Sequence, residues 1–173
     1  MKRYALLAAV TILAAACGSS SPAGPTPPPN TVTFTAALNP ANEVPPITNA
    51  DASGSGSGTF KMDLTRDSAG TITAAKATFV FTLNNFPAGT QVILGHIHTG
   101  GPGVTGSPIV NTGLTAANPV VLTNGSVTNQ TIGNIDVSGP NAQQIIDNPN
   151  GFYYNLHTVL NPGGAVRAQL VKQ

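Results

Sequence analysis

Apolar residues recur at every second position along several stretches of this chain, and this alternation constrains the fold more than any other feature. It runs through residues 31–38, 59–65 and 77–83, where polar or small residues stand between the apolar ones. Successive side chains of a β-strand point to opposite faces of a sheet, so the pattern is typical of strands with one buried face. Many Thr, Val, Asn, Gly and Pro residues, beside few Glu and Lys, also favour strands over helices.

Shorter segments of strand-like sequence follow, separated by turns rich in Gly and Pro. Within Thr71–Leu83, Ile72 is out of phase with the later apolar positions, which predicts a β-bulge near Ala74. Gly139–Asp147 is predicted to form one short helix before the turn residues at 148–151. Further strands are expected over residues 91–99, 107–111, 119–123, 127–132, 151–159 and 164–171. About eight short strands at this spacing indicate an all-β domain, either an antiparallel β-sandwich or a barrel.

Charged side chains are scarce, with 7 Lys and Arg and 6 Asp and Glu among 173 residues, or 8%. Soluble domains carry about 25%. So few cationic side chains cannot neutralise several phosphates at once, which excludes nucleic-acid binding through a basic patch. The hydrophobic share of 40% is too high for a chain that is disordered throughout.

The first residues have the pattern of an export signal. Met1–Arg3 supplies a positive start, and Tyr4–Ala16 is an apolar run shorter than the roughly 20 residues that span a bilayer as a helix. The run ends in LAAACG at 13–18, which resembles the lipobox of bacterial lipoproteins. We therefore expect a lipoprotein signal peptide over residues 1–16 and a lipid-modified Cys17. An ordinary secretory signal is the alternative.

A lipid on Cys17 would anchor the exported chain to the membrane of the bacterial cell envelope. Acyl chains such as palmitate contribute about 0.8 kcal/mol for each CH₂ group that they bury. Gly18 rather than Asp follows the cysteine, which favours the outer membrane by the sorting rule of such lipoproteins. Residues 17–30 are uncharged and rich in Pro, Gly and Ser, which predicts a disordered tether before a domain over residues 31–173. Cys17 is the one cysteine, so no intramolecular disulfide can form.

All three histidines lie in two strand-like segments. His96 and His98 are two positions apart, so their imidazoles leave the same face of a strand, and His157 could join them if its strand lies alongside. Three imidazoles suit zinc, with Zn–N distances near 2.0 Å, and they also suit copper. The alternative is structural, with the histidines hydrogen-bonded to the loop at 99–106. The sequence does not decide whether the histidines bind copper, bind zinc or bind no metal.

Four motifs resemble the chordin-type (CHRD) domain, and they occur in the order in which that family has them. They cover nearly all of the chain from residue 31 to 171, and they are Asn42–Pro46, His96–Gly100, Gly151–Thr158 and Asn161–Leu170. The resemblance implies an antiparallel β-sandwich of immunoglobulin-like character. The last motif of the family usually reads Gly-Glu-Ile-Arg-Gly-Gln, whereas this chain has Ala165 at the acidic position and Ala168 at the second glycine. Any ion pair that the family makes through that acidic residue is absent.

The same resemblance implies a binding or structural module, and it supplies no established activity for microbial members of the family. The sequence also shows no nucleophile beside a base, no acid–base pair and no phosphate-binding loop. We therefore expect a non-catalytic module of the cell envelope rather than an enzyme, with a protein or matrix partner that the sequence does not name. The alternative is a metal-binding envelope protein that uses the three histidines, either a copper or zinc carrier or a weak redox enzyme.

A fainter resemblance, to copper-zinc superoxide dismutases, rests on the His-x-His strand and the late Arg167. That family needs six histidines and an aspartate for its two metals, so a complete dismutase site cannot be built from three histidines. Arg167 could bind an anion beside the histidines, or it could hydrogen-bond to loop carbonyls or pair with Glu43 or an Asp. Tyr153 and Tyr154 point to opposite faces of their strand, so we expect one in the core and the other at the surface.

Overall fold

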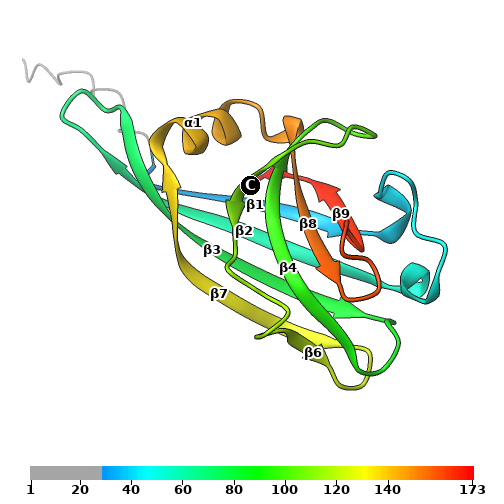
Figure 1. Ribbon diagram of the computed structural model, residues 1–173. Helices are drawn as coiled ribbons and strands as arrows, with labels where there is room; N and C mark the ends of the chain where they lie inside the picture. Colours follow the sequence, from blue (N-terminus) through cyan, green and yellow to red (C-terminus); the bar gives the residue numbers. More distant parts are fainter. Residues whose placement is uncertain (1–28) are drawn as a thin grey trace, which may run out of the picture.

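The computed structural model describes residues 29–173 and shows two antiparallel β-sheets that face each other (Figure 1). The predicted signal peptide, Cys17 and most of the tether at 17–30 lie outside the described residues. The first sheet has the strand order β10-β1-β2-β3-β7, and the second has the order β5-β4-β8-β9, with β6 also paired to β4. The predicted antiparallel β-sandwich is confirmed.

The strands of this part of the chain are ten rather than about eight, and three of them are long. Their bounds are β1 (Thr31–Leu38), β2 (Ser55–Arg66), β3 (Ile72–Asn84), β4 (Thr90–Thr99), β5 (Pro108–Asn111), β6 (Val120–Leu122), β7 (Val127–Ser138), β8 (Phe152–Thr158), β9 (Val166–Gln169) and β10 (Val171–Lys172). Short 3-10 helices lie at Pro40–Asn42, Ala50–Ser53 and Pro149–Gly151, and the predicted α-helix is α1 (Gly139–Asp147).

Two of the expected strands differ from those in the structure. The strand expected over 127–132 is longer in the structure and ends at Ser138. The backbone is irregular at Asn134, where φ is 62°, and the chain pairs with β3 again after this residue. The strand expected over 164–171 is divided between the sheets, since β9 pairs with β8 and β10 pairs with β1. The chain therefore crosses from the second sheet to the first at Leu170.

The predicted bulge near Ala74 is confirmed. Thr65 pairs with Ala74 and Arg66 pairs with Ile72, so Thr73 is the extra residue on β3. The extra residue changes the phase of the alternation and allows Ile72 to be buried.

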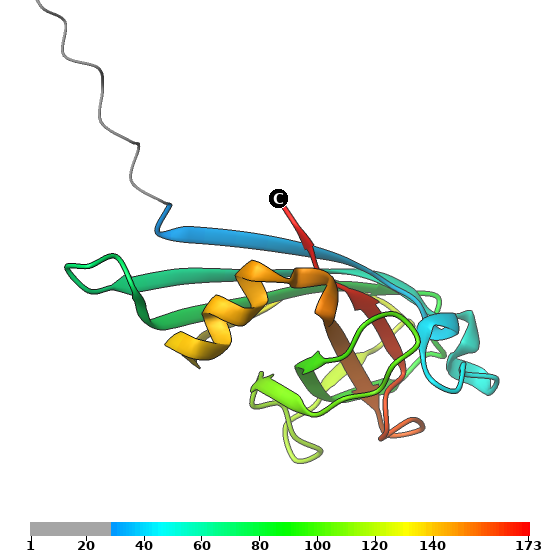
Figure 2. The same cartoon turned by 90° about the horizontal axis from the view of Figure 1, so that it is seen from above.

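The helix α1 covers a part of the first sheet that the second sheet does not reach, as Figure 2 shows. The hydroxyl of Ser138 caps its N-terminus by accepting a hydrogen bond from the amide of Asn141. Ala142 and Ile145 lie on its buried face and join the core. Within the described residues, no helix is long and apolar enough to span a membrane.

Aromatic rings form a continuous row that connects the two sheets. Phe34, Phe60 and Phe79 are cross-strand partners on β1, β2 and β3, with ring centroids 6.0 and 4.9 Å apart. Phe79 meets Tyr154 of β8 edge to face at 5.4 Å. The Tyr154 ring occupies the space above Gly58, where a Cβ atom would overlap it. Gly58 thus permits the close approach that positions β8.

Replacing this glycine is expected to separate the sheets locally. Gly58→Ala should lower the free energy of unfolding by about 1–3 kcal/mol, because the added methyl group overlaps a fully buried ring. Gly133→Ala is the matched control, since Gly133 is exposed on β7 and its Cβ would lie 3.5 Å from the nearest atom. The control should change stability by less than about 1 kcal/mol. Urea unfolding measures both variants, and equal losses would contradict the proposed packing.

Candidate functional site

The side chains of β8 alternate between the apolar core and a second buried layer on the outer face of its sheet. Tyr154 and Leu156 face the first sheet, whereas Tyr153, Asn155 and His157 point outward. All seven residues of β8 are nevertheless buried. The outer face of this strand is therefore polar and yet excluded from water.

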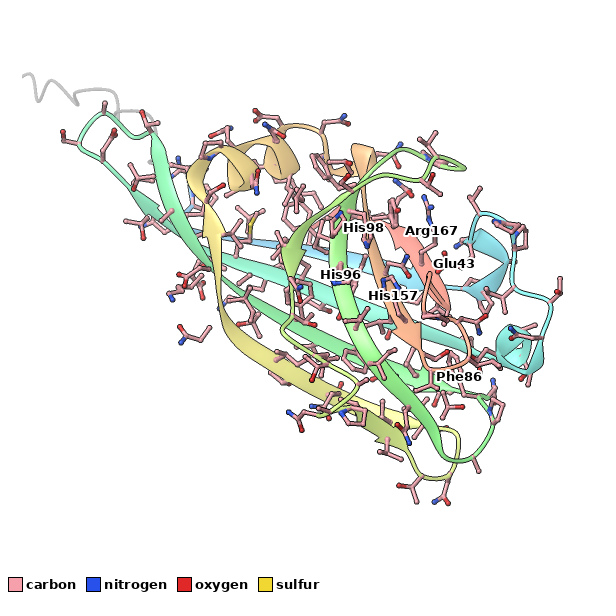
Figure 3. All side chains as sticks on the ribbon, in the orientation of Figure 1. Glu43, Phe86, His96, His98, His157 and Arg167 are labelled. Atoms are coloured by element: carbon pink, nitrogen blue, oxygen red, sulfur yellow. The ribbon has the colours of Figure 1, made fainter. Side chains whose placement is uncertain are left out.

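Residues of the neighbouring strands extend this layer. Residues that pair directly across an antiparallel sheet lie on the same face. The registers of β4, β8 and β9 therefore place seven side chains together, and we call this set the polar layer: His96, His98, Tyr153, Asn155, His157, Arg167 and Gln169. Figure 3 shows four of them, the three histidines and Arg167, on these adjacent strands, with Glu43 approaching from the segment after β1.

Three loops cover the polar layer. The loop between β4 and β5 brings the carbonyl oxygens of Val104 and Gly106 to it, and the loop between β8 and β9 brings that of Pro162. The segment that follows β1 contributes Glu43. Because of this cover, the three histidines are only 5–8% exposed.

The histidines His96, His98 and His157 converge on one point. Nδ1 of His96 lies 3.1 Å from Nε2 of His157, and one ligand nitrogen from each of the three rings lies within 4.8 Å of the others. In a tetrahedral zinc site, Zn–N bonds of 2.0–2.1 Å place two nitrogens about 3.3 Å apart. The cluster is thus close to the spacing that a single ion requires.

Backbone carbonyls fix the orientation of two of the rings. Nδ1 of His98 donates a hydrogen bond to the carbonyl of Gly106, and Nδ1 of His157 donates to the carbonyl of Pro162, both at 2.9 Å. A carbonyl oxygen can only accept, so each neutral ring carries its proton on Nδ1 and a lone pair on Nε2. Nε2 of His157 accepts from Nδ1 of His96, whereas Nε2 of His98 is buried without a hydrogen-bond partner.

Burial keeps the three imidazoles neutral. It lowers the pKa of His96 from its ordinary value of 6.5 to about 4, with a smaller contribution from His157 and His98 in the same direction. Burial also lowers the pKa of His98 and of His157, although their hydrogen bonds to backbone carbonyls act in the opposite direction. Neutral imidazole is the form that binds metal ions. To bind an ion through Nδ1, His96 would carry its proton on Nε2 instead.

The guanidinium of Arg167 lies behind Tyr153 rather than against the histidines. The Tyr153 ring stacks on His98, with centroids 4.9 Å apart, and the guanidinium carbon lies 3.5 Å from the centre of the same ring. Because β8 runs between β4 and β9, the ring separates Arg167 from His98. Nη2 of Arg167 donates to the carbonyls of Gly101 and Val104 at 3.4 and 2.9 Å.

The expectation that either Tyr153 or Tyr154 lies at the surface is wrong. They are 3% and 0% exposed. Tyr153 does point outward from its sheet, but the loop between β4 and β5 covers it, and its hydroxyl accepts a hydrogen bond from the amide of Gly106 at 3.3 Å. Sequence reasoning also missed Asn155 as part of the site. The alternation of β8 could have identified both, since they lie two and four positions from His157.

Glu43 is held against β9 by the segment that precedes it. Asn39 forms an isolated bridge with Arg167, and the Asn42 side chain donates to the Arg167 carbonyl at 3.0 Å. The Glu43 side chain is buried and its Oε1 has no hydrogen-bond partner. Within residues 29–173 no salt bridge joins it to Arg167. Burial raises the pKa of Glu43 to about 7, and the positive charge of Arg167 opposes this shift.

Comparison with known proteins identifies the family. The chain matches the family model of the CHRD domain over residues 34–170. It therefore belongs to the CHRD domain family, and the resemblance inferred from its four motifs is confirmed. A CHRD domain indicates a structural or binding module. No curated protein and no solved structure matches the chain.

The buried histidines predict a protein that is destabilised by weak acid. Below pH 6.5 the unfolded chain protonates His96, whereas the folded protein excludes that proton until about pH 4. The contribution of His96 to the free energy of unfolding should therefore be complete above pH 6.5 and decrease by on the order of 2 kcal/mol as the pH falls through 4.

Urea unfolding of the metal-free protein and of His96→Gln across this pH range measures the effect. The raised pKa of Glu43 contributes with the opposite sign, so the difference between the two proteins isolates the histidine. The free energy of unfolding of the wild type minus that of His96→Gln should decrease as the pH falls from 6.5 to 4. A difference that does not change with pH would contradict the prediction.

Proposed function

We propose that the protein is a metal-binding module anchored to the bacterial cell envelope, with one copper or zinc ion held by His96, His98 and His157. The observation that carries the proposal is the unpartnered Nε2 of His98, which is buried within a group of three converging imidazoles. Leaving a buried acceptor unpaired costs about 1–3 kcal/mol. Coordination of an ion would remove this cost.

A purely structural role explains only part of the geometry. The hydrogen bonds to Gly106 and Pro162 use Nδ1 of His98 and His157 and leave both Nε2 atoms without a proton. Nε2 of His157 lies against Nδ1 of His96, and Nε2 of His98 is buried without a partner. Carbonyl partners of this kind orient metal-ligating histidines and fix their tautomer. The hydrogen bonds that support a structural role are thus the same ones that favour metal binding.

The turn that presents the Pro162 carbonyl is itself fixed by buried polar contacts. The carboxylate of Asp51 accepts from the Thr158 hydroxyl at 2.6 Å and from the Asn161 side chain at 2.7 Å. The backbone amide of Asn161 in turn donates to the Thr158 hydroxyl at 3.0 Å. Asp51 therefore supports the orientation of His157 from outside the cluster.

The chemistry of the ligands narrows the choice of ion. Neutral imidazoles suit zinc and copper, whereas magnesium and calcium prefer oxygen ligands. Three protein ligands leave a fourth position for water or for a group on a partner. Because loops bury the cluster, we propose storage or transfer of the ion as its role.

Calorimetric titration of the metal-free protein with Cu²⁺ and with Zn²⁺ tests the metal site. We expect one site with a Kd below about 10 μM for at least one of the ions. The double variant His96→Ala/His98→Ala should lose it. Asp136→Ala is the matched control, because Asp136 is an exposed carboxylate outside the cluster, and it should bind as the wild type does. Absence of tight binding, or binding unchanged in the double variant, would end the metal proposal.

The location in the envelope rests on the residues LAAACG at 13–18. Cells grown with radiolabelled palmitate should label the wild-type protein and fail to label Cys17→Ala. Gly18→Asp should still be labelled but should move from the outer to the inner membrane fraction. Label that persists in Cys17→Ala would refute the lipid anchor, and a Gly18→Asp variant that stays in the outer membrane would refute the sorting argument.

A further inference from the structure

A cleft of about 480 Å³ opens next to the polar layer, and no histidine of the cluster lines it. Its volume is within the range of small-molecule sites, about 300–1,000 Å³. The segment after β1, the loop between β4 and β5, and strand β9 form its walls. Its lining includes Ala41, Glu43, Val44, Pro102, Arg167 and Ala168.

Arg167 has unused hydrogen-bond donors at this cleft. A guanidinium carries five N–H groups, and the side-chain hydrogen bonds of Arg167 within the described residues all come from Nη2. The same residues place no carboxylate within salt-bridge distance of it. The side chain is only 2% exposed. A buried charge without a counter-ion is costly, and an anion in the cleft would offset that cost.

Glu43 is the second ionisable group of the cleft, beside Arg167. Gly164 confines its carboxyl group, since a Cβ atom at Gly164 would lie 2.7 Å from Oε2. The other oxygen, Oε1, is buried without a partner. Burial raises the pKa of Glu43 to about 7, so below that pH the group is protonated and can donate a hydrogen bond to an anionic oxygen.

The remaining walls are mostly apolar. Ala41, Val44, Pro102 and Ala168 contribute methyl, isopropyl and ring carbons. The Nε and Nη1 groups, which have no hydrogen-bond partner among the described residues, can donate to the oxygens of a singly charged carboxylate. A doubly charged phosphate would find only one cation here. The cleft thus fits a carboxylate that carries a small apolar body.

We propose that this cleft binds a small apolar carboxylate, whose oxygens accept hydrogen bonds from Arg167 and Glu43. The site is distinct from the histidine cluster, because the Tyr153 ring lies between Arg167 and His98. Both the C-terminus of a peptide and a short fatty acid present this chemistry. The first would belong to a protein partner and the second to a free metabolite.

Titrations of the ¹⁵N-labelled protein monitored by NMR test the site with four probes. Hexanoate represents the fatty acid and N-acetyl-L-leucine the peptide C-terminus, and hexanamide and N-acetyl-L-leucinamide are their uncharged counterparts. At least one carboxylate should bind with a Kd on the order of 1 mM and shift the amide signals of Val44 and Gly103. Its amide should bind about tenfold more weakly or not at all. Binding of neither acid, or equal binding of acid and amide, would overturn the proposal.

A matched pair of variants changes only the charge at the rim of the cleft. Val44 is 42% exposed, so Val44→Glu and Val44→Gln should both leave the core intact. The added carboxylate of Val44→Glu should weaken binding about tenfold relative to Val44→Gln. Arg167→Lys keeps the positive charge but removes the Nε and Nη1 donors of the planar guanidinium, and it should weaken binding by a similar factor. If Arg167→Lys does not fold, the Val44 pair decides, and equal affinities in that pair would overturn the proposal.

Discussion

Strand β8 is buried on both of its faces, and the core, the polar layer and the covering loops are arranged around it. Its inward face carries Tyr154 and Leu156 into the apolar core, and its outward face carries Tyr153, Asn155 and His157. A polar face can be buried only if its donors and acceptors find partners. The covering loops supply these partners through the carbonyls of Val104, Gly106 and Pro162. The loops and the polar layer therefore form one unit, in which Nε2 of His98 and Oδ1 of Asn155 are buried without a hydrogen-bond partner.

The few charged side chains of this chain shape the structure mainly where they are buried. The two salt bridges of the described residues, Lys61–Asp63 and Lys76–Asp136, join exposed side chains and contribute little to stability. Arg167, by contrast, is buried on the Tyr153 ring. That ring divides the polar layer into a neutral part, which holds the histidines, and a charged part, which faces the cleft. Because of this division, the proposed metal ion and the proposed carboxylate would lie on opposite sides of the Tyr153 ring.

Local patterns predicted much of the fold and part of the site. Alternation and turn residues located most strands, the helix and the bulge at Thr73, because these features depend on neighbours in sequence. The continuation of β7 past Asn134 was missed because the positive φ at that residue interrupts the alternation. The burial of Tyr153 was missed because a loop from a distant part of the chain covers it. His96 and His98 could be placed together by their spacing, but the approach of His157 depends on which strand lies beside β4, and alternation carries no information on strand order.

X-ray absorption spectroscopy of the metal-loaded protein tests whether the three imidazoles hold one ion. The fine structure above the absorption edge of the bound ion reports the type, number and distance of its ligands. Three imidazole nitrogens near 2.0 Å, reduced in number in a His98→Ala sample, are the predicted result. A first shell of oxygen ligands alone, or a spectrum that His98→Ala leaves unchanged, would contradict the claim.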